Sequence, residues 1–418
     1  MSDGSANQKL DPRTYERALS CVHCGLCLPV CPTYLQTGLE AEGPRGRIQL
    51  MRGISDGNIS ATQAVRGHLD SCLDCRACET ACPSNVVYHE LIEETRQHIA
   101  PSGASPGAAW LVKHILPFPE RLKWALMPAR ILQRLGLWKV IARGKFLRML
   151  PEDGPVWPGK LPRRSGSAGA KIRIGFFGGC VGQSLFGDVN RKAIELLAAC
   201  GAEVIAPDGQ VCCGALHYHD GDAKTARRMA RRNVDEFSSD GKLDFVVTAV
   251  AGCGAMLRDY GLLLRDDSKY RERAATFGGS VRDICQVLDE LPMPPMKHAI
   301  HMTVTYHDAC HLAHGQKVTA EPRRLLGKIP GLKLVELAES DLCCGAAGSY
   351  NLTHPKMASD LAERKLKNIS ATGARTVVAG NVGCALRLAA EAKMRGDDLR
   401  IVHPVELLHQ AVFGARVE

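Results

Sequence analysis

The chain has 418 residues, which is enough for two or three domains of about 150 residues each. Hydrophobic residues make up 45% of it and charged residues 23%, as in an ordinary soluble globular protein, and its formal net charge is +9. The N-terminal residues lack the basic and apolar regions of a secretory signal, and no segment approaches the roughly 18 uncharged apolar residues of a membrane-spanning helix. We therefore expect a cytoplasmic protein.

Eight of the 18 cysteines form two copies of one spacing, Cys-x2-Cys-x2-Cys-x3-Cys-Pro. The first copy holds Cys21, Cys24, Cys27 and Cys31, and the second holds Cys72, Cys75, Cys78 and Cys82. Bacterial ferredoxins bind [4Fe–4S] clusters with this spacing, because a tight loop presents three thiolates to one cluster and the fourth cysteine reaches the other cluster. Paired zinc ribbons are the alternative, but zinc does not require a third cysteine or a following proline.

The spacing predicts two [4Fe–4S] clusters and their ligands. One cluster would be bound by Cys21, Cys24, Cys27 and Cys82, and the other by Cys72, Cys75, Cys78 and Cys31. The surrounding residues 1–100 look helical, since the stretch 90–100 mixes charged and apolar residues without a β-branched run. We therefore predict an α-helical ferredoxin-type module that carries electrons.

A basic segment that contains all four tryptophans follows over residues 101–170. Between Ala108 and Leu150 it has nine lysines and arginines and one acid, Glu120. Basic amphipathic helices of this kind lie on anionic lipid surfaces, or pack on the protein itself or on a partner subunit. No nucleic-acid-binding motif accompanies the charge, so we expect no nucleic-acid role. The composition of residues 151–155 and 163–169 predicts a flexible linker at the end of this connector.

The remaining chain contains an internal duplication, with copies over residues 171–300 and 301–418. Three landmarks of the first copy are Cys180, the pair Cys212-Cys213 before a glycine, and Cys253. They recur 130, 131 and 131 residues later as Cys310, Cys343-Cys344 and Cys384. Offsets this similar indicate a repeat rather than coincidence.

Each copy has the pattern of an α/β unit with a parallel sheet, because apolar strand-like runs alternate with helical stretches. The strand-like runs are 172–180, 245–250, 304–310 and 376–380, and the helical stretches are 191–199, 224–237 and 356–367. The repeated cysteines would then lie near the carboxyl ends of strands, where open α/β sheets bind their ligands.

The repeated cysteines form a second candidate cofactor site. They are Cys180, Cys212, Cys213, Cys253, Cys310, Cys343, Cys344 and Cys384. Free cysteines are often small buried hydrophobic residues, but four thiols in register twice are hard to attribute to packing alone. Cys200 and Cys285 lie outside the repeated positions, so we expect them to be core residues.

Both copies resemble the CCG domain of heterodisulfide reductases, in which each full copy ends in Cys-x-x-Cys and binds an unusual [4Fe–4S] cluster. This chain departs from that pattern, since Met256 and Arg387 stand where the last cysteine would be. We therefore do not expect a five-thiolate cluster. A four-thiolate cluster in each repeat, one site shared between the repeats, and a thiol–disulfide role for the vicinal pairs remain open.

The whole chain is similar to the iron–sulfur subunits of the glycolate oxidase (glycolate dehydrogenase) family. The matching stretches begin at Cys21, Glu42, Cys72, Cys212 and Cys343. The resemblance implies an α+β multidomain protein, with an N-terminal α-helical ferredoxin-type module followed by a duplicated α/β CCG domain pair. Relatives with this layout serve lactate, glycerol-3-phosphate and succinate dehydrogenases, and the residues around the vicinal pairs favour the glycolate branch.

The resemblance also implies how the protein acts. FAD-binding partner subunits would oxidise glycolate to glyoxylate, and this chain would carry the electrons to a quinone-type acceptor. The chain has no G-x-G-x-x-G fingerprint between a strand and a helix, so it shows no flavin or nicotinamide site of its own. The competing hypotheses are a self-contained CCG-type disulfide reductase and a non-enzymatic scaffold with structural clusters.

Five histidines lie near the repeated cysteines and are candidates for metal binding or proton transfer, which quinone reduction requires. They are His217, His219, His307, His311 and His354. Among them, His217, His307 and His311 are our candidates for a catalytic redox or proton-transfer role. An ordinary hydrogen-bonded histidine is the alternative for each.

Overall fold

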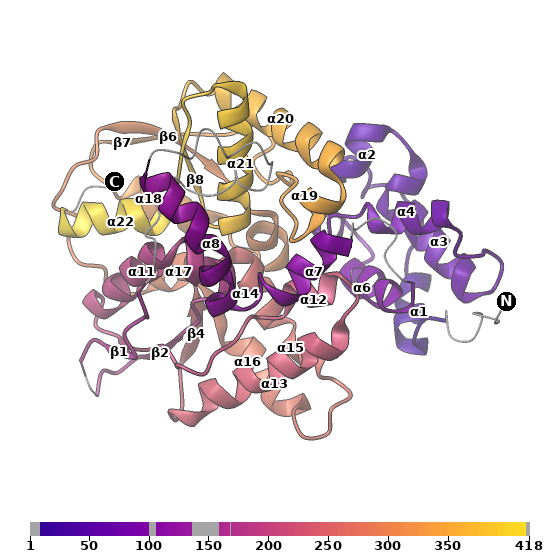
Figure 1. Cartoon of the computed structure of the whole chain (residues 1–418), viewed down its shortest axis with the longest axis horizontal. Coiled ribbons are helices and arrows are strands. Elements are labelled where there is room, and N and C mark those ends of the chain that lie inside the picture. Colours follow the sequence, from indigo (N-terminus) through magenta and orange to yellow (C-terminus); the bar gives the residue numbers. More distant parts are fainter. Residues whose placement is uncertain (1–8, 100–105, 136–158, 168, 415–418) are drawn as a thin grey trace.

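The computed structural model describes residues 9–99, 106–135, 159–167 and 169–414. It has the predicted fold class: a helical N-terminal domain, a connector of two helices, and two α/β repeats (Figure 1). In Figure 1 the N-terminal domain (indigo) lies to one side of the two repeats, and the connector helices α7 and α8 run across the front of the repeats. The two repeats and the N-terminal domain meet near the centre of the molecule.

The N-terminal domain consists of short helices around the two cysteine loops. Proline occupies the first position of three of them, at Pro12, Pro32 and Pro44, where the missing N–H costs nothing. Its core is formed by apolar side chains such as Met51 and Leu91. The helices are α1 (Pro12–Leu19), α2 (Pro32–Thr37), η1 (Glu40–Glu42), α3 (Pro44–Ser55), α4 (Gln63–Asp70), α5 (Ala77–Thr80) and α6 (Tyr88–His98).

The first repeat is built on a five-stranded sheet with the order β1-β3-β2-β4-β5. Strands β2 to β5 are parallel, and the short edge strand β1 is antiparallel to β3. The strands are β1 (Arg164–Ser165), β2 (Arg173–Phe176), β3 (Glu203–Ile205), β4 (Phe245–Thr248) and β5 (Val281–Asp283). The helices are α10 (Cys180–Leu185), α11 (Gly187–Ala199), α12 (Ala215–His219), α13 (Ala223–Ser239), α14 (Ala251–Arg258), α15 (Tyr260–Leu263), α16 (Arg271–Ser280) and α17 (Ile284–Glu290).

The second repeat has a four-stranded parallel sheet with the order β7-β6-β8-β9, the same order as β3-β2-β4-β5 in the first. The strands are β6 (Met302–His307), β7 (Leu332–Val335), β8 (Thr376–Ala379) and β9 (Arg400–Val402). The helices are the π-helical turn η3 (His311–Gly315), α18 (Ala320–Gly327), α19 (Tyr350–Thr353), α20 (Pro355–Ala371), α21 (Val382–Arg395) and α22 (Pro404–Phe413). The matching order agrees with the predicted duplication.

The predicted linker needs one correction. Residues 163–169 have a linker composition, but the structure places Arg164–Ser165 in strand β1, at the edge of the first sheet. The guanidinium of Arg164 pairs with Glu203 on the neighbouring strand β3, at 3.1 Å, and with Asp240 at 3.2 Å. Composition could not reveal these partners because they lie about 40 and 75 residues further along the chain.

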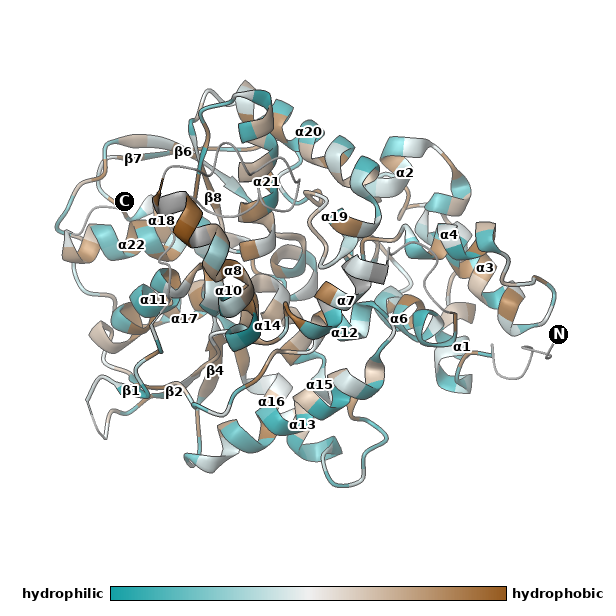
Figure 2. Cartoon of the chain, viewed as in Figure 1, coloured by the Kyte–Doolittle hydropathy of each residue, from teal (hydrophilic) through white to brown (hydrophobic). Residues whose placement is uncertain are grey.

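The two repeats share one hydrophobic core. Helices α11 and α17 of the first repeat pack against α18 and α22 of the second, and both sheets contribute side chains such as Val247 and Val304. Cys200 and Cys285 are buried in this core, which confirms their predicted role as packing residues. Figure 2 shows the consequence, with hydrophobic residues on central strands such as β4 and hydrophilic residues on outer helices such as α13.

The connector forms helices α7 (Pro106–His114) and α8 (Pro119–Arg134). Leu122 and Leu126 of α8 are buried and pack against Val181 and Leu185 of α10. The basic residues and tryptophans predicted between 136 and 158 lie outside the described residues. Within the part of the chain that the structure describes, no helix has the length and hydrophobicity needed to cross a lipid bilayer.

Candidate functional site

The cysteines of the two ferredoxin-type motifs gather in two neighbouring cavities of the N-terminal domain. The first cavity is lined by Cys21, Cys24, Cys27 and Cys82, and the second by Cys31, Cys72, Cys75 and Cys78. Cys78 also borders the first cavity, so the two sites adjoin. The structure thus brings together each of the two predicted ligand sets, including the exchange of the fourth cysteine between the motifs.

The two cysteine loops share an unusual backbone conformation. The second and fourth residues after the first cysteine have positive φ in both loops: His23 (55°) and Gly25 (85°), Asp74 (50°) and Arg76 (63°). Non-glycine residues in this region cost about 1–2 kcal/mol each, so the fold must compensate for them. A loop that wraps three thiolates around one cluster provides that compensation, and the residues therefore fit two [4Fe–4S] clusters.

Burial and hydrogen bonds prepare the second cavity for thiolates that are bound to a metal. Burial raises the pKa of the Cys75 and Cys78 thiols well above the usual value, so they ionise only with a nearby positive charge such as iron. The N–H of Asp74 donates to Cys72 Sγ at 3.4 Å. The buried guanidinium of Arg47 adds positive charge near Cys72 and is held by Glu42 at 2.8 Å.

The two cluster sites differ in their exposure. In the first, Cys24 is exposed, and the side chains of Val22 and Leu26 beside it are 66% and 55% exposed. In the second, all four cysteines are buried. The loop of the second site is attached to the second repeat, since His311 Nε2 donates to the Asp74 carbonyl at 2.9 Å and Tyr350 Oη donates to the Ser71 carbonyl at 2.9 Å.

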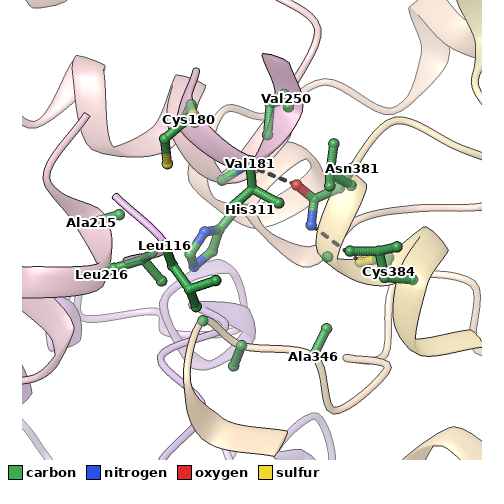
Figure 3. A pocket seen from close by; sticks show the side chains of 18 of the residues that line it. Leu116, Cys180, Val181, Ala215, Leu216, Val250, His311, Ala346, Asn381 and Cys384 are labelled. Carbon is green, nitrogen blue, oxygen red and sulfur yellow. Dashed lines mark hydrogen bonds between the residues drawn. The ribbon is translucent and has the colours of Figure 1, made fainter. Parts of the chain in front are cut away.

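All eight repeated cysteines line one further cavity, of about 220 Å³, between the two repeats. Leu116, Leu122 and Leu126 of the connector also line this cavity. Figure 3 shows Cys180 of the first repeat and Cys384 of the second toward opposite sides, with Leu116 of the connector and His311 and Asn381 of the second repeat also reaching into it. The cavity lies next to the second cluster site, because Leu73 from that loop lines it too.

The glycine after each vicinal cysteine pair is required by the backbone. Gly214 and Gly345 have φ values of +92° and +80°. A Cβ on Gly345 would lie 2.6 Å from the carbonyl oxygen of Ala358, and one on Gly214 would lie 3.2 Å from Cα of Ala226. Glycine therefore lets each cysteine pair approach helix α13 or α20 closely.

The thiols of each repeat are close together. Cys180 Sγ lies 3.4 Å from Cys212 Sγ, and Cys310 Sγ lies 3.9 Å from Cys343 Sγ. A fifth thiol is absent from both described sites: Met256 is buried, and the guanidinium of Arg387 pairs with Glu391 at 2.7 Å. The residues present therefore do not fit a five-thiolate cluster, as the sequence predicts.

The structure separates the five candidate histidines. His219 and His311 line the thiol cavity, with ring centroids 6.0 Å apart. His307 is buried beside Cys344 and Cys384, with its ligand atom within 4.8 Å of both thiols. His217 instead contacts the Lys113 carbonyl of the connector at 3.2 Å, and His354 stacks on Tyr350 at 4.5 Å.

A buried charged cluster next to the cavity was not predicted from the sequence. Asp74 and Glu93 of the N-terminal domain meet His219 of the first repeat, and Glu93 forms an ion pair with His219. Burial and the charge of Glu93 raise the pKa of Asp74 to about 7. Burial by itself would lower the pKa of His219 and raise that of Glu93. The attraction between their opposite charges outweighs burial, so the pKa of His219 rises to about 9 and that of Glu93 falls to about 2. The three residues come from distant parts of the chain, so no local pattern could have revealed them.

Two family models match the parts of the chain that contain these sites. A family model described as a cysteine-rich domain (CCG) matches residues 174–258 and 304–389, and one described as a 4Fe-4S dicluster domain matches residues 17–86. A hypothetical protein of Helicobacter pylori has the same overall fold, with a TM-score of 0.57 and 9% identity over 97% of this chain and 74% of that one.

Two bacterial relatives match nearly the whole length of the chain. The probable glycolate oxidase iron-sulfur subunit of Bacillus subtilis (strain 168) is 37% identical over 94% of both chains. The glycolate oxidase iron-sulfur subunit of Escherichia coli (strain K12) is 31% identical, also over 94% of both chains. A subunit of the fumarate reductase (CoM/CoB) of Methanothermobacter marburgensis is 28% identical over 98% of this chain and 76% of that one. The chain therefore belongs to the family of glycolate oxidase iron–sulfur subunits.

Proposed function

We propose that the chain is the electron-transfer subunit of a flavin-dependent glycolate dehydrogenase, and that it links an FAD-binding partner to a quinone-type acceptor. Iron–sulfur electron transfer follows from the dicluster domain and from the family. The substrate comes from the relatives, which are glycolate oxidase subunits, and glycolate would be oxidised to glyoxylate in the partner. A related lactate, glycerol-3-phosphate or succinate dehydrogenase is the alternative.

The order of the three thiol sites is the observation that supports this proposal. An exposed site at Cys24, a buried site at Cys75 and the thiol cavity of the repeats follow one another through the molecule. Cys75 packs in one apolar cluster with Cys310 and Cys343, so the second site adjoins the second repeat directly. An exposed site followed by a buried one suits an electron conduit between two partners, because exposure gives a partner access and differing exposure sets different cluster potentials.

The chain's own residues hold and tune these sites. Each of the two [4Fe–4S] clusters, when bound, accepts and donates one electron. A flavin that has taken two electrons from its substrate could therefore pass them on one at a time. Cys21, Cys24, Cys27 and Cys82 would hold the first, and Cys31, Cys72, Cys75 and Cys78 the second. Backbone N–H groups, such as that of Val86 at 3.4 Å from Cys82 Sγ, and the cation of Arg47 stabilise negative charge on the thiolates.

We place the flavoprotein contact at the first cluster site. Val22 and Leu26 expose apolar side chains around the exposed Cys24, and a partner that covers them would bring its flavin next to this site. Leu19 and Leu39 of the same domain are also exposed, at 48% and 55%. An exposed apolar patch at a redox site is typical of a transient electron-transfer contact.

Peripheral contact with an anionic membrane is part of the same proposal, because a quinone-type acceptor dissolves in lipid. Helix α8 turns Leu122 and Leu126 inward, while Trp110 of α7 (57%) and Trp124 of α8 (60%) are exposed. The segment 108–150, which contains α8 and most of α7, has nine basic residues and one acid. Exposed tryptophans beside excess positive charge favour an anionic lipid surface.

Substitutions at the proposed flavoprotein contact test whether electrons from the flavoprotein enter at the first cluster site. We expect Val22→Asp with Leu26→Asp to slow cluster reduction by glycolate and the flavoprotein about tenfold or more, because charge replaces the centre of the contact. Reduction by dithionite should be unchanged, since this small reagent needs no docking surface. Rapid mixing with absorbance near the cluster band measures both rates.

Met394→Asp is the matched control, because Met394 is an exposed apolar residue of α21, far along the chain from the cluster loops. It should reduce at the wild-type rate with either electron source. Equal rates for the double variant and the control would rule out docking at the first cluster site, and a chain that never copurifies with a flavoprotein would rule out the proposed function itself.

A further inference from the structure

The thiol sites of the two repeats are chemically different, although their cysteines correspond. The offsets that relate the cysteines also pair three other positions of the two repeats. Phe177 corresponds to His307, Val234 to Lys365 and Val250 to Asn381. The residues of both sets are buried or partly buried. Three apolar neighbours in one repeat are thus replaced by an imidazole, an ammonium and an amide in the other, so the second repeat alone has nitrogen groups at these positions.

His307 has the orientation of a metal ligand. It is the last residue of strand β6 and is completely buried. Its Nδ1 donates to the Ser340 carbonyl at 3.1 Å, because a carbonyl can only accept, and in the neutral ring Nε2 then carries the lone pair. Among the described residues Nε2 has no oxygen or nitrogen partner, and it faces the thiol of Cys344. A ring held through one nitrogen by a carbonyl, with the other nitrogen turned toward thiol ligands, is the usual arrangement of a metal-binding histidine.

The free nitrogen belongs to a compact set of three donors. His307 Nε2 and the Sγ atoms of Cys344 and Cys384 all lie within 4.8 Å of one another, and all three residues are buried. Ligands at about 2.0–2.3 Å from one zinc ion are at most about 4.6 Å apart, so donors within 4.8 Å of one another need at most a small closure to bind a single ion. In a cubane cluster each thiolate binds a different iron, which spreads the ligands further.

Neighbouring residues support negative charge on this set. Asn381 Nδ2 donates to Cys384 Sγ at 3.4 Å, and its Oδ1 accepts from the N–H of Gly252 in the first repeat at 3.3 Å. The buried ammonium of Lys365 donates to the same Ser340 carbonyl that holds His307, at 3.2 Å. One carbonyl therefore fixes the histidine ring and a cation beside the thiols, an arrangement that orients the ligands of metal centres.

We propose that the second repeat binds a single thiophilic divalent metal ion, with zinc as the ion that this donor set favours, through His307 Nε2 and the thiolates of Cys344 and Cys384. Zinc takes nitrogen and sulfur ligands in tetrahedral geometry, and Cys310 or Cys343, whose thiols line the same cavity, can supply the fourth. The corresponding site of the first repeat does not bind zinc in this way, because Phe177 provides no ligand and no three donors there are as compact among the described residues.

Metal analysis of the full-length chain, purified anaerobically with its iron, tests this proposal. We expect about one zinc per chain in addition to iron, with an X-ray absorption spectrum that shows nitrogen at about 2.0–2.1 Å and sulfur at about 2.3 Å. Cys384→Ser and His307→Phe, which copies the first repeat, should lose most of the zinc while their iron content stays at the wild-type level.

The first repeat provides matched controls at equivalent positions. Cys253→Ser and Phe177→Leu should keep the zinc, because they alter the corresponding thiol and ring without touching the donor set. His307→Cys should also keep it, since a thiolate replaces the nitrogen ligand, and this variant separates loss of a ligand from loss of folding. Wild-type protein without zinc, equal zinc loss in Cys384→Ser and Cys253→Ser, or loss of iron instead of zinc in Cys384→Ser would each overturn the proposal.

Discussion

At the scale of single residues, His403 shows how a buried neutral side chain joins the two repeats. Its Nε2 donates to the carbonyl of Ala249 in the first repeat at 2.9 Å, and its Nδ1 accepts from the N–H of Val405 at the start of α22. Both ring nitrogens are occupied only if the ring is neutral. Burial accordingly lowers the pKa of His403 to about 4.

This pKa predicts an acid-sensitive contact between the repeats. Between about pH 6.5 and pH 4 the unfolded chain binds a proton at His403 and the folded chain does not, so this contribution is complete above pH 6.5 and is lost as the pH falls toward 4. The loss amounts to about 3 kcal/mol over that range. His403→Gln, which cannot titrate, should be less stable than wild type at pH 7.5.

Thermal unfolding of both proteins between pH 5 and pH 7.5 measures this effect. The difference in midpoint between wild type and His403→Gln should shrink as the pH falls, because only the wild type loses stability through this residue. A difference that stays constant across the range would show that His403 does not titrate as the structure implies.

At the scale of secondary-structure elements, the connector helices are apolar on two faces. The inner face of α8, with Leu122 and Leu126, lines the thiol cavity together with Leu116 from the turn between the two helices. The outer face carries Trp110 and Trp124, and Ile131 is exposed near the end of α8. A helix that packed only on its own protein would keep its second face polar, so the exposed apolar residues indicate a further contact.

Vesicle binding tests the proposed lipid contact of these helices. Trp110→Ser with Trp124→Ser should reduce cosedimentation with phosphatidylglycerol vesicles several-fold, because buried aromatic surface drives interfacial binding. Salt should weaken wild-type binding, since the remaining attraction is between exposed charges. Phe413→Ser alters an exposed aromatic residue of α22 and should bind like wild type. Equal binding by all three proteins would remove the lipid contact.

At the scale of the whole molecule, ion pairs and polar contacts hold the dicluster domain against the repeats. Arg76 Nη2 of the second cluster loop lies 2.5 Å from Asp259 Oδ2 after α14, and Arg265 Nη1 lies 3.0 Å from Glu90 Oε2 of α6. Arg76 is buried, and Asp259 is mostly buried. The alignment of the second cluster site with the thiol cavity therefore depends on a charge pair shielded from solvent.

A double-mutant cycle tests the importance of this pair. Arg76→Met should destabilise the protein by about 3–5 kcal/mol, because it leaves the carboxylate of Asp259 buried without its partner. Adding Asp259→Leu should recover much of that loss, since no unpaired charge remains. Chemical denaturation followed by circular dichroism gives the four free energies of unfolding. If the two effects simply add, the pair does not couple the domains.

Much of the architecture was predictable because it is encoded locally. The spacing of Cys21 to Cys31 and of Cys72 to Cys82 indicates the clusters, and the offsets of about 130 residues indicate the two α/β repeats. The edge strand at Arg164 was missed, because its composition is that of a linker and only pairing with β3 makes it a strand. The chemical difference between Phe177 and His307 was also present in the sequence, and comparison of the repeats at that offset would have found it.

The sequence by itself determined which residues could bind clusters and that the cysteine-rich unit is duplicated, because short spacings and repeats act within one loop or one copy. Only the tertiary structure decided that both thiol sets face one cavity, that the first cluster site is exposed and the second buried, and that His307 meets Cys344 and Cys384. These features depend on packing between segments far apart in the chain, which no local pattern records.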